Sequence, residues 1–192
     1  MGELNFQFDA QKTAQAVAFL LRLSHDKKKS KGHLVKMLYG ADKRQIRKGG
    51  IPLTGDEPYS MPNGPVLSNV LDLFNGKKKD AYWDRFVSKA TSDTHLVSLL
   101  DDRIGEDLLS DSEKDSLRVA WSVFGHLSWP QVKDLSHKIF PEWEDTGRSR
   151  KRIEFESIYK IVGHTPGMAS EMAAQQKEGE LVATIFGNAK TR

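Results

Sequence analysis

The chain has 192 residues, of which 38% are hydrophobic and 29% are charged, a composition that suits a globular protein with a substantial apolar core. No segment approaches the roughly 18 to 20 uninterrupted apolar residues that a membrane-spanning helix needs, and the N-terminus lacks the basic and apolar regions of a secretory signal. We therefore expect a soluble, cytoplasmic protein without a membrane partner. The chain contains no cysteine, which excludes disulfide bonds and thiolate-bound zinc.

Positive charge is unevenly distributed along the chain, although the net charge is only +3. Nine lysine and arginine residues stand against two aspartates between residues 26 and 48, and a second basic segment, GRSRKR, occupies residues 147–152. Such segments are most often solvated surface, and the alternatives are a surface for an acidic protein or a surface for nucleic acid. Nucleic acid is the least favoured partner, because aromatic residues are not interleaved with the basic ones as a stacking surface requires.

Two helices are predicted near the N-terminus. Residues 10–23 are apolar almost all round and follow Asp9, a residue type that caps helix N-termini, so this helix should lie in the core. After a solvated loop at residues 24–32, an amphipathic helix should run from His33 to the glycine pair at 49–50, because glycine accepts the left-handed conformation that closes a helix. One face of this second helix is apolar. Another face, expected to be basic and solvated, carries Lys36, Tyr39, Lys43 and Arg47.

A compact turn is predicted after the second helix. Residues 51–60, IPLTGDEPYS, favour a tight loop or short hairpin, because proline removes backbone donors and glycine supplies a positive φ. Within this turn, Asp56 is expected to accept backbone N–H bonds from its own loop. Pro65 is expected at the first position of a third helix that ends at residues 75–76.

The second half of the chain contains two helices with the same start signal, a capping box in which serine precedes Glu or Gln by three residues. These helices follow Ser110 and Ser128 and end at Gly125 and Pro141. Before them, residues 82–100 predict either a short helix followed by a strand or a small hairpin.

We expect the C-terminal part to form a helix over residues 153–163 and a last helix at about residues 167–177. The resulting fold class is mainly α, a compact single-domain helical fold with a small β-hairpin or loop insertion. Residues 1–165 should form this domain, with the helix and tail of residues 166–192 packing on it or trailing from it.

Two blocks of the sequence together resemble the Panacea (SocA-like) antitoxin domain family. The first block contains KMLYGAD, PLTGD and NGPVLS, at residues 36–42, 52–56 and 63–68, and is similar to the family pattern K-hydrophobic-LY-x-AD, PITGD and GPV-x-S. No single one of these motifs is specific to the family, but the order and spacing of the motifs taken together are specific. The resemblance covers about residues 14–163. The second block contains, in the family's order, Leu109-Ser110, Gly125, Leu127-Ser128-Trp129, Leu135-Ser136-His137 and Pro141-Glu142-Trp143.

The resemblance implies a binding protein. Members of this family act as antitoxins that neutralise small protein toxins by direct contact, and SocA-like members also deliver the toxin to a protease. The resemblance therefore predicts an antitoxin whose partner is a cognate protein toxin. The alternatives are a proteolytic adaptor, with a protease as second partner, and a nucleic-acid-binding regulatory protein.

Marks of catalysis are absent from the sequence. The six histidines show no HExxH pattern or close pairing, and no GxGxxG, GxxxxGK[ST] or GxSxG motif occurs. We therefore expect no enzymatic activity, no catalytic residues, no metal and no cofactor. His137 with Asp134 would suit an acid/base pair, but a histidine that is hydrogen-bonded between two helices is the favoured interpretation.

A partner should dock on the second predicted helix and the turn after it, because a rigid helix face beside a fixed turn costs little ordering entropy on binding. We expect Trp121 and Trp143 in the core and an exposed Trp129 as a hot-spot candidate. Charge reversal at Lys36 or Lys43 should leave the protein folded and abolish toxin neutralisation. The predicted toxin-binding residues are Lys36, Tyr39, Lys43, Arg47, Thr54, Asp56, Pro65, Trp129 and His137.

Overall fold

The computed structural model describes residues 4–165, 167–168, 171 and 174, and in this part of the chain helices predominate over short strands. The helices are α1 (Ala10–Arg22), α2 (Lys31–Arg47), α3 (Ser68–Phe74), α4 (Ala81–Phe86), α5 (Asp111–Phe124), α6 (Trp129–Ile139) and α7 (Phe155–Ile161). The strands are β1 (Lys28–Ser30), β2 (Pro58–Met61), β3 (Gly64–Leu67), β4 (Leu96–Ser98) and β5 (Lys151–Arg152). The mainly α fold class with a small β component is confirmed.

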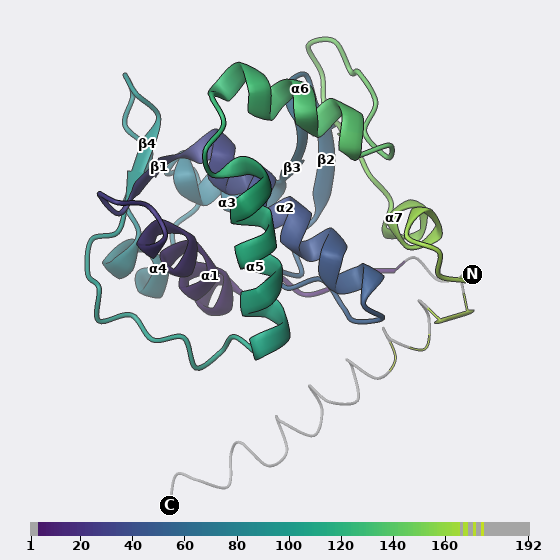
Figure 1. Ribbon diagram of the computed structural model, residues 1–192, viewed down its shortest axis with the longest axis horizontal. Helices are drawn as coiled ribbons and strands as arrows, with labels where there is room; N and C mark the ends of the chain where they lie inside the picture. Colours follow the sequence, from purple (N-terminus) through teal and green to yellow (C-terminus); the bar gives the residue numbers. More distant parts are fainter. Residues whose placement is uncertain (1–3, 166, 169–170, 172–173, 175–192) are drawn as a thin grey trace, which may run out of the picture.

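Helix α2 lies at the centre of the molecule and packs against α1, α3, α5, α6 and α7 (Figure 1). Helix α1 is buried throughout residues 13–21, as its continuous apolar sequence predicts. Its N-terminus is capped as expected, because the Asp9 side chain accepts a hydrogen bond from the backbone N–H of Lys12 at 2.9 Å. These two helices contribute a large share of the core, and further elements pack against them.

The predicted helix start at Pro65 is wrong. Residues 64–67 instead form β3, which pairs antiparallel with β2, and α3 begins at Ser68. Gly64, with a φ of 94°, closes the turn of this hairpin. Pro65 is tolerated because β3 is an edge strand of the sheet β3-β2-β5, where the missing backbone N–H breaks no ladder.

Three further segments, two predicted as loops and one with two predicted arrangements, contain short strands that pair with other parts of the chain. The predicted loop at residues 24–32 contains β1, which pairs with β4, and the basic segment at residues 147–152 contains β5, which pairs with β2. Residues 82–100 form a helix followed by a strand, one of the two predicted arrangements.

The two predicted capping boxes are confirmed at the starts of α5 and α6, and α7 lies within the helix expected over residues 153–163. Trp121 and Trp143 pack against the core while each keeps part of its surface exposed. Most of the helix expected at residues 167–177 and all of the tail after it lie outside the described residues. Across the described range, no helix has the length and apolar character needed to cross a bilayer.

Candidate protein-binding site

The predicted basic face of α2 lies largely inside the molecule. Lys36 and Tyr39 each expose only 2% of their surface, Lys43 is partly buried, and Arg47 is exposed. The expectation of a solvated face is therefore wrong for Lys36 and Tyr39. The physical reason is that α2 has neighbours on nearly every side, so that polar as well as apolar positions of this helix are covered.

The Lys36 side chain joins α2 to the β2–β3 hairpin. Its Nζ donates a hydrogen bond to the Pro65 carbonyl oxygen at 2.6 Å, and within the described residues it forms no ion pair with a carboxylate. Burial lowers the pKa of Lys36 to about 7. Gly64 leaves room for this contact, because a Cβ there would lie 3.0 Å from Lys36 Nζ and 2.5 Å from Ser136 Oγ.

Asp42 holds the turn that follows α2. Its two carboxylate oxygens accept hydrogen bonds from the backbone N–H of Thr54 at 2.9 Å and from Thr54 Oγ1 at 2.5 Å. Both residues are buried, and desolvation raises the pKa of Asp42 to about 7, although the hydrogen bonds from Thr54 act in the opposite direction. Thr54 is therefore part of the interior of the fold.

Asp56 caps α3 from a distance in sequence. Its carboxylate accepts hydrogen bonds from the backbone N–H groups of Asn69 and Val70, at 3.0 and 2.8 Å, and from that of Glu57 at 2.7 Å. Residue 67, which precedes α3, supplies no side-chain cap. The prediction that Asp56 accepts backbone N–H bonds is confirmed, but two of the three donors belong to the first turn of α3 and only one to its own loop. Burial raises the pKa of Asp56.

Glu142 ties the segment after α6 back to α2. Its side chain is fully buried and accepts hydrogen bonds from Tyr39 Oη at 2.6 Å and from Lys43 Nζ at 2.7 Å. Burial, together with the Glu142 carboxylate, raises the pKa of Tyr39 well above its ordinary value. The positive charge of Lys43 is thus neutralised inside the protein.

His137 is held by stacking. Its ring lies 3.8 Å from that of Trp143, centroid to centroid, at an interplanar angle of 6°, and Trp143 Nε1 donates to the Met61 carbonyl oxygen at 2.8 Å. Within the described residues, the buried Nε2 of His137 has no hydrogen-bond partner, and no bond to Asp134 is formed. The expected hydrogen-bonded bridge between helices is therefore replaced by an aromatic stack. Desolvation lowers the pKa of His137, and the charges of nearby lysines lower it further.

Trp129 is exposed at the start of α6, as predicted, with 37% of its surface accessible. It borders a cavity of about 450 Å³ whose other walls include Val35, Met61 and His95. The indole also covers Gly32, where a Cβ would lie 2.5 Å from the ring. Trp129 therefore both seals the first turn of α2 and presents an accessible aromatic surface.

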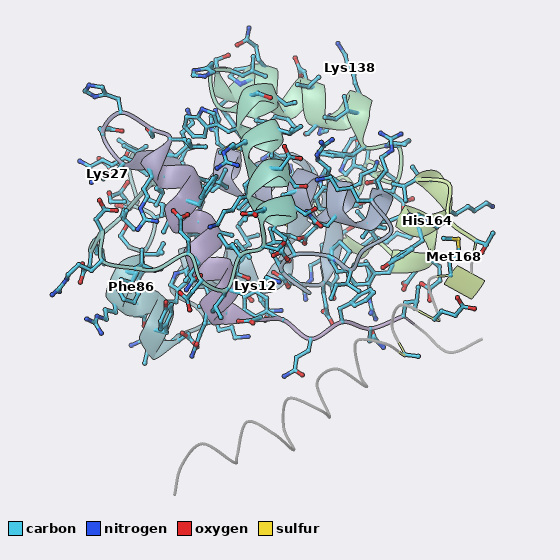
Figure 2. The ribbon with its side chains drawn as sticks, turned by 60° about the horizontal axis from the view of Figure 1, so that its bottom comes forward. Lys12, Lys27, Phe86, Lys138, His164 and Met168 are labelled. Carbon is cyan, nitrogen blue, oxygen red and sulfur yellow. The ribbon has the colours of Figure 1, made fainter. Side chains whose placement is uncertain are left out.

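The basic segments do not form a continuous surface of free cations. Lys27 pairs with Asp102 at 2.7 Å, and Lys151 pairs with Glu144 at 2.5 Å. Figure 2 shows Lys27, of the first basic segment, at one edge of the molecule and Lys138, of α6, at another. Positive charge is thus dispersed, and part of it is neutralised by neighbouring carboxylates.

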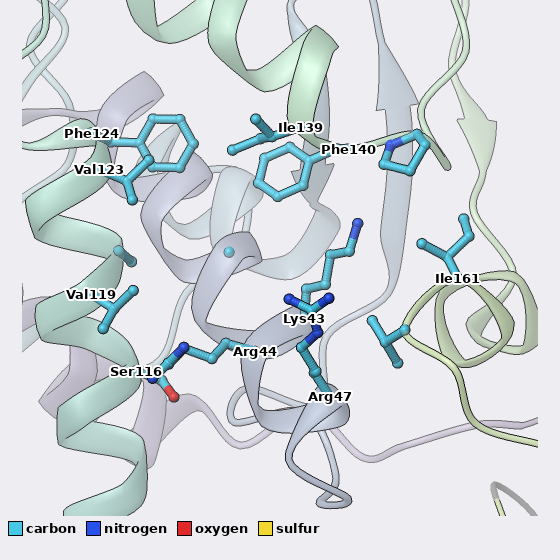
Figure 3. A pocket seen from close by; sticks show the side chains of 14 residues that line it. Lys43, Arg44, Arg47, Ser116, Val119, Val123, Phe124, Ile139, Phe140 and Ile161 are labelled. Atoms are coloured by element: carbon cyan, nitrogen blue, oxygen red, sulfur yellow. The ribbon is translucent and has the colours of Figure 1, made fainter.

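A groove of about 400 Å³ lies over α2, between α5 and α7 (Figure 3). In this view Lys43, Arg44 and Arg47 rise from α2 between the side chains of α5 and those of α7. We call this hollow the α5–α7 groove. Its apolar walls include Val119 and Val123 of α5, Ile139 of α6 and Ile161 of α7.

Three aliphatic side chains in the walls of the α5–α7 groove are exposed. Val123, Ile139 and Ile161 expose 38%, 40% and 40% of their surfaces. Of the predicted toxin-binding residues, the groove brings together Lys43 and Arg47, while the separate cavity brings together Trp129 and the buried Lys36. The remaining predicted residues are buried or partly buried, His137 in its aromatic stack and Tyr39, Thr54, Asp56 and Pro65 in the polar contacts described above.

The walls of this groove were not predicted from the sequence. Val119 and Val123 are four residues apart on α5, on a different side from its buried residues Leu117 and Phe124. A second apolar pair at helical spacing was the available signal. Ile161 carried no such signal, because its position opposite α5 depends on the tertiary packing of α7.

No cluster suited to a metal was found in the described part of the chain, since no three histidine or carboxylate side chains converge there. The polar residues of the sequence motifs are instead engaged with backbone groups or with each other. The described structure therefore has buried polar side chains that hold its loops and helix ends, and a partly apolar groove on its outer surface.

The family model described as antitoxin SocA-like, Panacea domain, matches residues 34–144, and this confirms the resemblance identified from the sequence. No curated protein and no solved structure matches the chain. The matched residues include most of α2, the β2–β3 hairpin, α5 and α6, which together build most of the α5–α7 groove.

Proposed function

Since the chain belongs to the SocA-like antitoxin family, as a Panacea-domain member, we propose that it neutralises a cognate protein toxin in the cytoplasm by binding it directly. The observation that carries this proposal is the α5–α7 groove. Exposed aliphatic side chains gathered around a hollow are typical of protein-interaction surfaces. In this groove they adjoin Arg47, which is exposed as well.

Neutralisation by binding rather than catalysis is supported by how the motif residues are used. Asp42 and Asp56 are buried acceptors for backbone N–H groups, and Lys36 is a buried donor to a backbone carbonyl. Side chains committed in this way stabilise loops and helix ends. The motifs then define a shared scaffold, while partner choice belongs to the outer surface.

A protein partner is also favoured over nucleic acid by the charge distribution. Lys48 and Arg44 share Asp115, at 2.9 and 3.2 Å, and Lys27 pairs with Asp102. Binding to a phosphate backbone depends on cations that can replace counterions. Cations already paired with carboxylates are poorly suited to that role.

The test is co-expression. Each small open reading frame adjacent to the gene for this chain is expressed from an inducible promoter, with and without the chain, and growth is measured. We expect one product to arrest growth, the chain to restore it, and the two proteins to co-purify in a fixed stoichiometric ratio. Restoration at a small fraction of the toxin's amount would contradict neutralisation by binding. A fall in toxin level that depends on a protease would assign the adaptor role instead.

A further inference from the structure

We propose that the α5–α7 groove binds an amphipathic helix of the partner whose apolar stripe is flanked by carboxylates. This inference rests on the proposed function, because the partner is taken to be the toxin. It specifies the chemistry of the toxin segment that is bound. Three properties of the groove carry it: apolar walls, unpaired positive charge and walls that contain helices but no strand.

The apolar walls of the groove favour a ligand with a stripe of apolar side chains. Val123, Ile139 and Ile161 come from three different helices and leave about two-fifths of their surfaces accessible. Phe124 and Phe140, both buried, lie beneath them in the same hollow. A ligand that covers these side chains removes apolar surface from water, which is the main favourable contribution to protein association.

The positive charge of the groove favours a ligand that carries carboxylates. No aspartate or glutamate is among the described residues that line the groove, whereas Lys43, Arg44 and Arg47 are. Lys43 is neutralised by the buried Glu142, but Arg47 has neither an ion pair nor a hydrogen bond within the described part of the chain. Arg44 pairs with Asp115 through Nη2 at 3.2 Å, while its buried Nε lacks a partner there. A carboxylate of the ligand would supply the acceptor that the exposed guanidinium group of Arg47 lacks.

The secondary structure of the groove walls favours a helical ligand. The groove is bordered by α2, α5, α6 and α7 and by the residues that follow α6 and α7. Backbone groups inside helices are already hydrogen-bonded, so an extended segment would find no strand edge with which to pair. A helix satisfies its own backbone groups and binds through side chains, with anchors at helical spacing.

The charge preference is tested with two synthetic peptides and the full purified chain. Each peptide has about 18 residues, with leucines spaced to form one helical stripe. Glutamates flank the stripe in one peptide, and lysines flank it in the other. We expect the glutamate peptide to bind at least about tenfold more tightly, with a preference that weakens as salt is added. Equal affinity for the two peptides would overturn the proposal.

Variants locate the binding surface. Arg47→Glu should abolish the preference for the glutamate peptide, and Ile161→Ser should weaken its binding about fivefold or more. The matched controls are Arg148→Glu, an exposed arginine away from the groove, and Leu100→Ser, a leucine that is 57% exposed. Both controls should bind as the wild type does. Equal loss in the controls would place the site elsewhere and contradict the proposal.

The same variants separate this inference from the proposed function. If the chain restores growth but Arg47→Glu and Ile161→Ser restore it equally well, the groove inference fails and the antitoxin function stands. If the peptide preference is found but no adjacent toxin is neutralised, the antitoxin function fails. A wild-type dimer that Ile161→Ser dissociates would assign the groove to a second copy of the chain and overturn the inference.

Discussion

Replacing Asp56 by alanine is expected to remove the cap of α3 and to destabilise the whole fold. The carboxylate is fully buried and receives the backbone N–H groups of Glu57, Asn69 and Val70. Loss of an N-terminal cap costs about 1 kcal/mol, and a buried N–H left without an acceptor, as at Val70, costs about 2 kcal/mol more. The free energy of unfolding should therefore fall by about 3 kcal/mol, which for a chain of this size lowers Tm by about 9 °C.

The assay combines thermal unfolding, followed by circular dichroism, with hydrogen exchange at the amides of Asn69 and Val70. Asp56→Asn keeps one acceptor oxygen and should lose about half as much stability as Asp56→Ala. Asp72→Ala is the matched control, because Asp72 lies in the same helix and its side chain forms no hydrogen bond or ion pair with the rest of the described structure. A Tm for Asp56→Ala within about 2 °C of the wild-type value, with unchanged exchange at Val70, would refute the capping argument.

Three other predictions concern the buried polar residues and the hairpin. The folded-state pKa of Asp42, about 7, exceeds its ordinary value of 3.8, so the contribution of Asp42 to the free energy of unfolding falls as pH rises from 4 to 7. Asp42→Asn should therefore gain stability relative to the wild type over that range. A Tm difference between the two proteins that is constant with pH would contradict this. Lys36→Glu should lower Tm by more than about 10 °C in the same melting experiment, because it buries an unpaired charge, and a wild-type Tm would show that this position is solvated as the sequence suggested. Gly64→Ala should lower the free energy of unfolding by about 2 kcal/mol more than Gly147→Ala, measured by denaturant unfolding. Both glycines have a positive φ, but an added Cβ would meet Ser136 only at Gly64. Equal losses of unfolding free energy in the two variants would exclude the predicted clash.

Helix ends were predictable because their signals are local. The Asp9 cap and the capping boxes at Ser110 and Ser128 depend on residues within one turn of each other, and all three are present. Pro65 shows where local signals fail. Proline suits both the first turn of a helix and an edge strand, and only the pairing of residues 64–67 with β2 decides between them.

The burial of Lys36 could not be read from helical periodicity. Periodicity identifies which residues share a face of α2, but it does not tell how many other elements pack around that helix. Lys36 is covered because the β2–β3 hairpin and α6 lie against its side of α2. The α5–α7 groove depends in the same way on tertiary packing, since Ile161 and Val123 are brought to one hollow from helices far apart in sequence.

Direct binding of the toxin through the α5–α7 groove is tested by mixing the purified chain with its toxin and measuring complex formation by calorimetry. We expect a complex of fixed stoichiometry with the wild type and with Arg148→Glu. We also expect at least about a hundredfold weaker binding with the double variant Arg47→Glu/Ile161→Ser, provided that its melting temperature is unchanged. Wild-type affinity in the folded double variant would contradict binding through the groove, and neutralisation without any measurable complex would contradict direct binding itself.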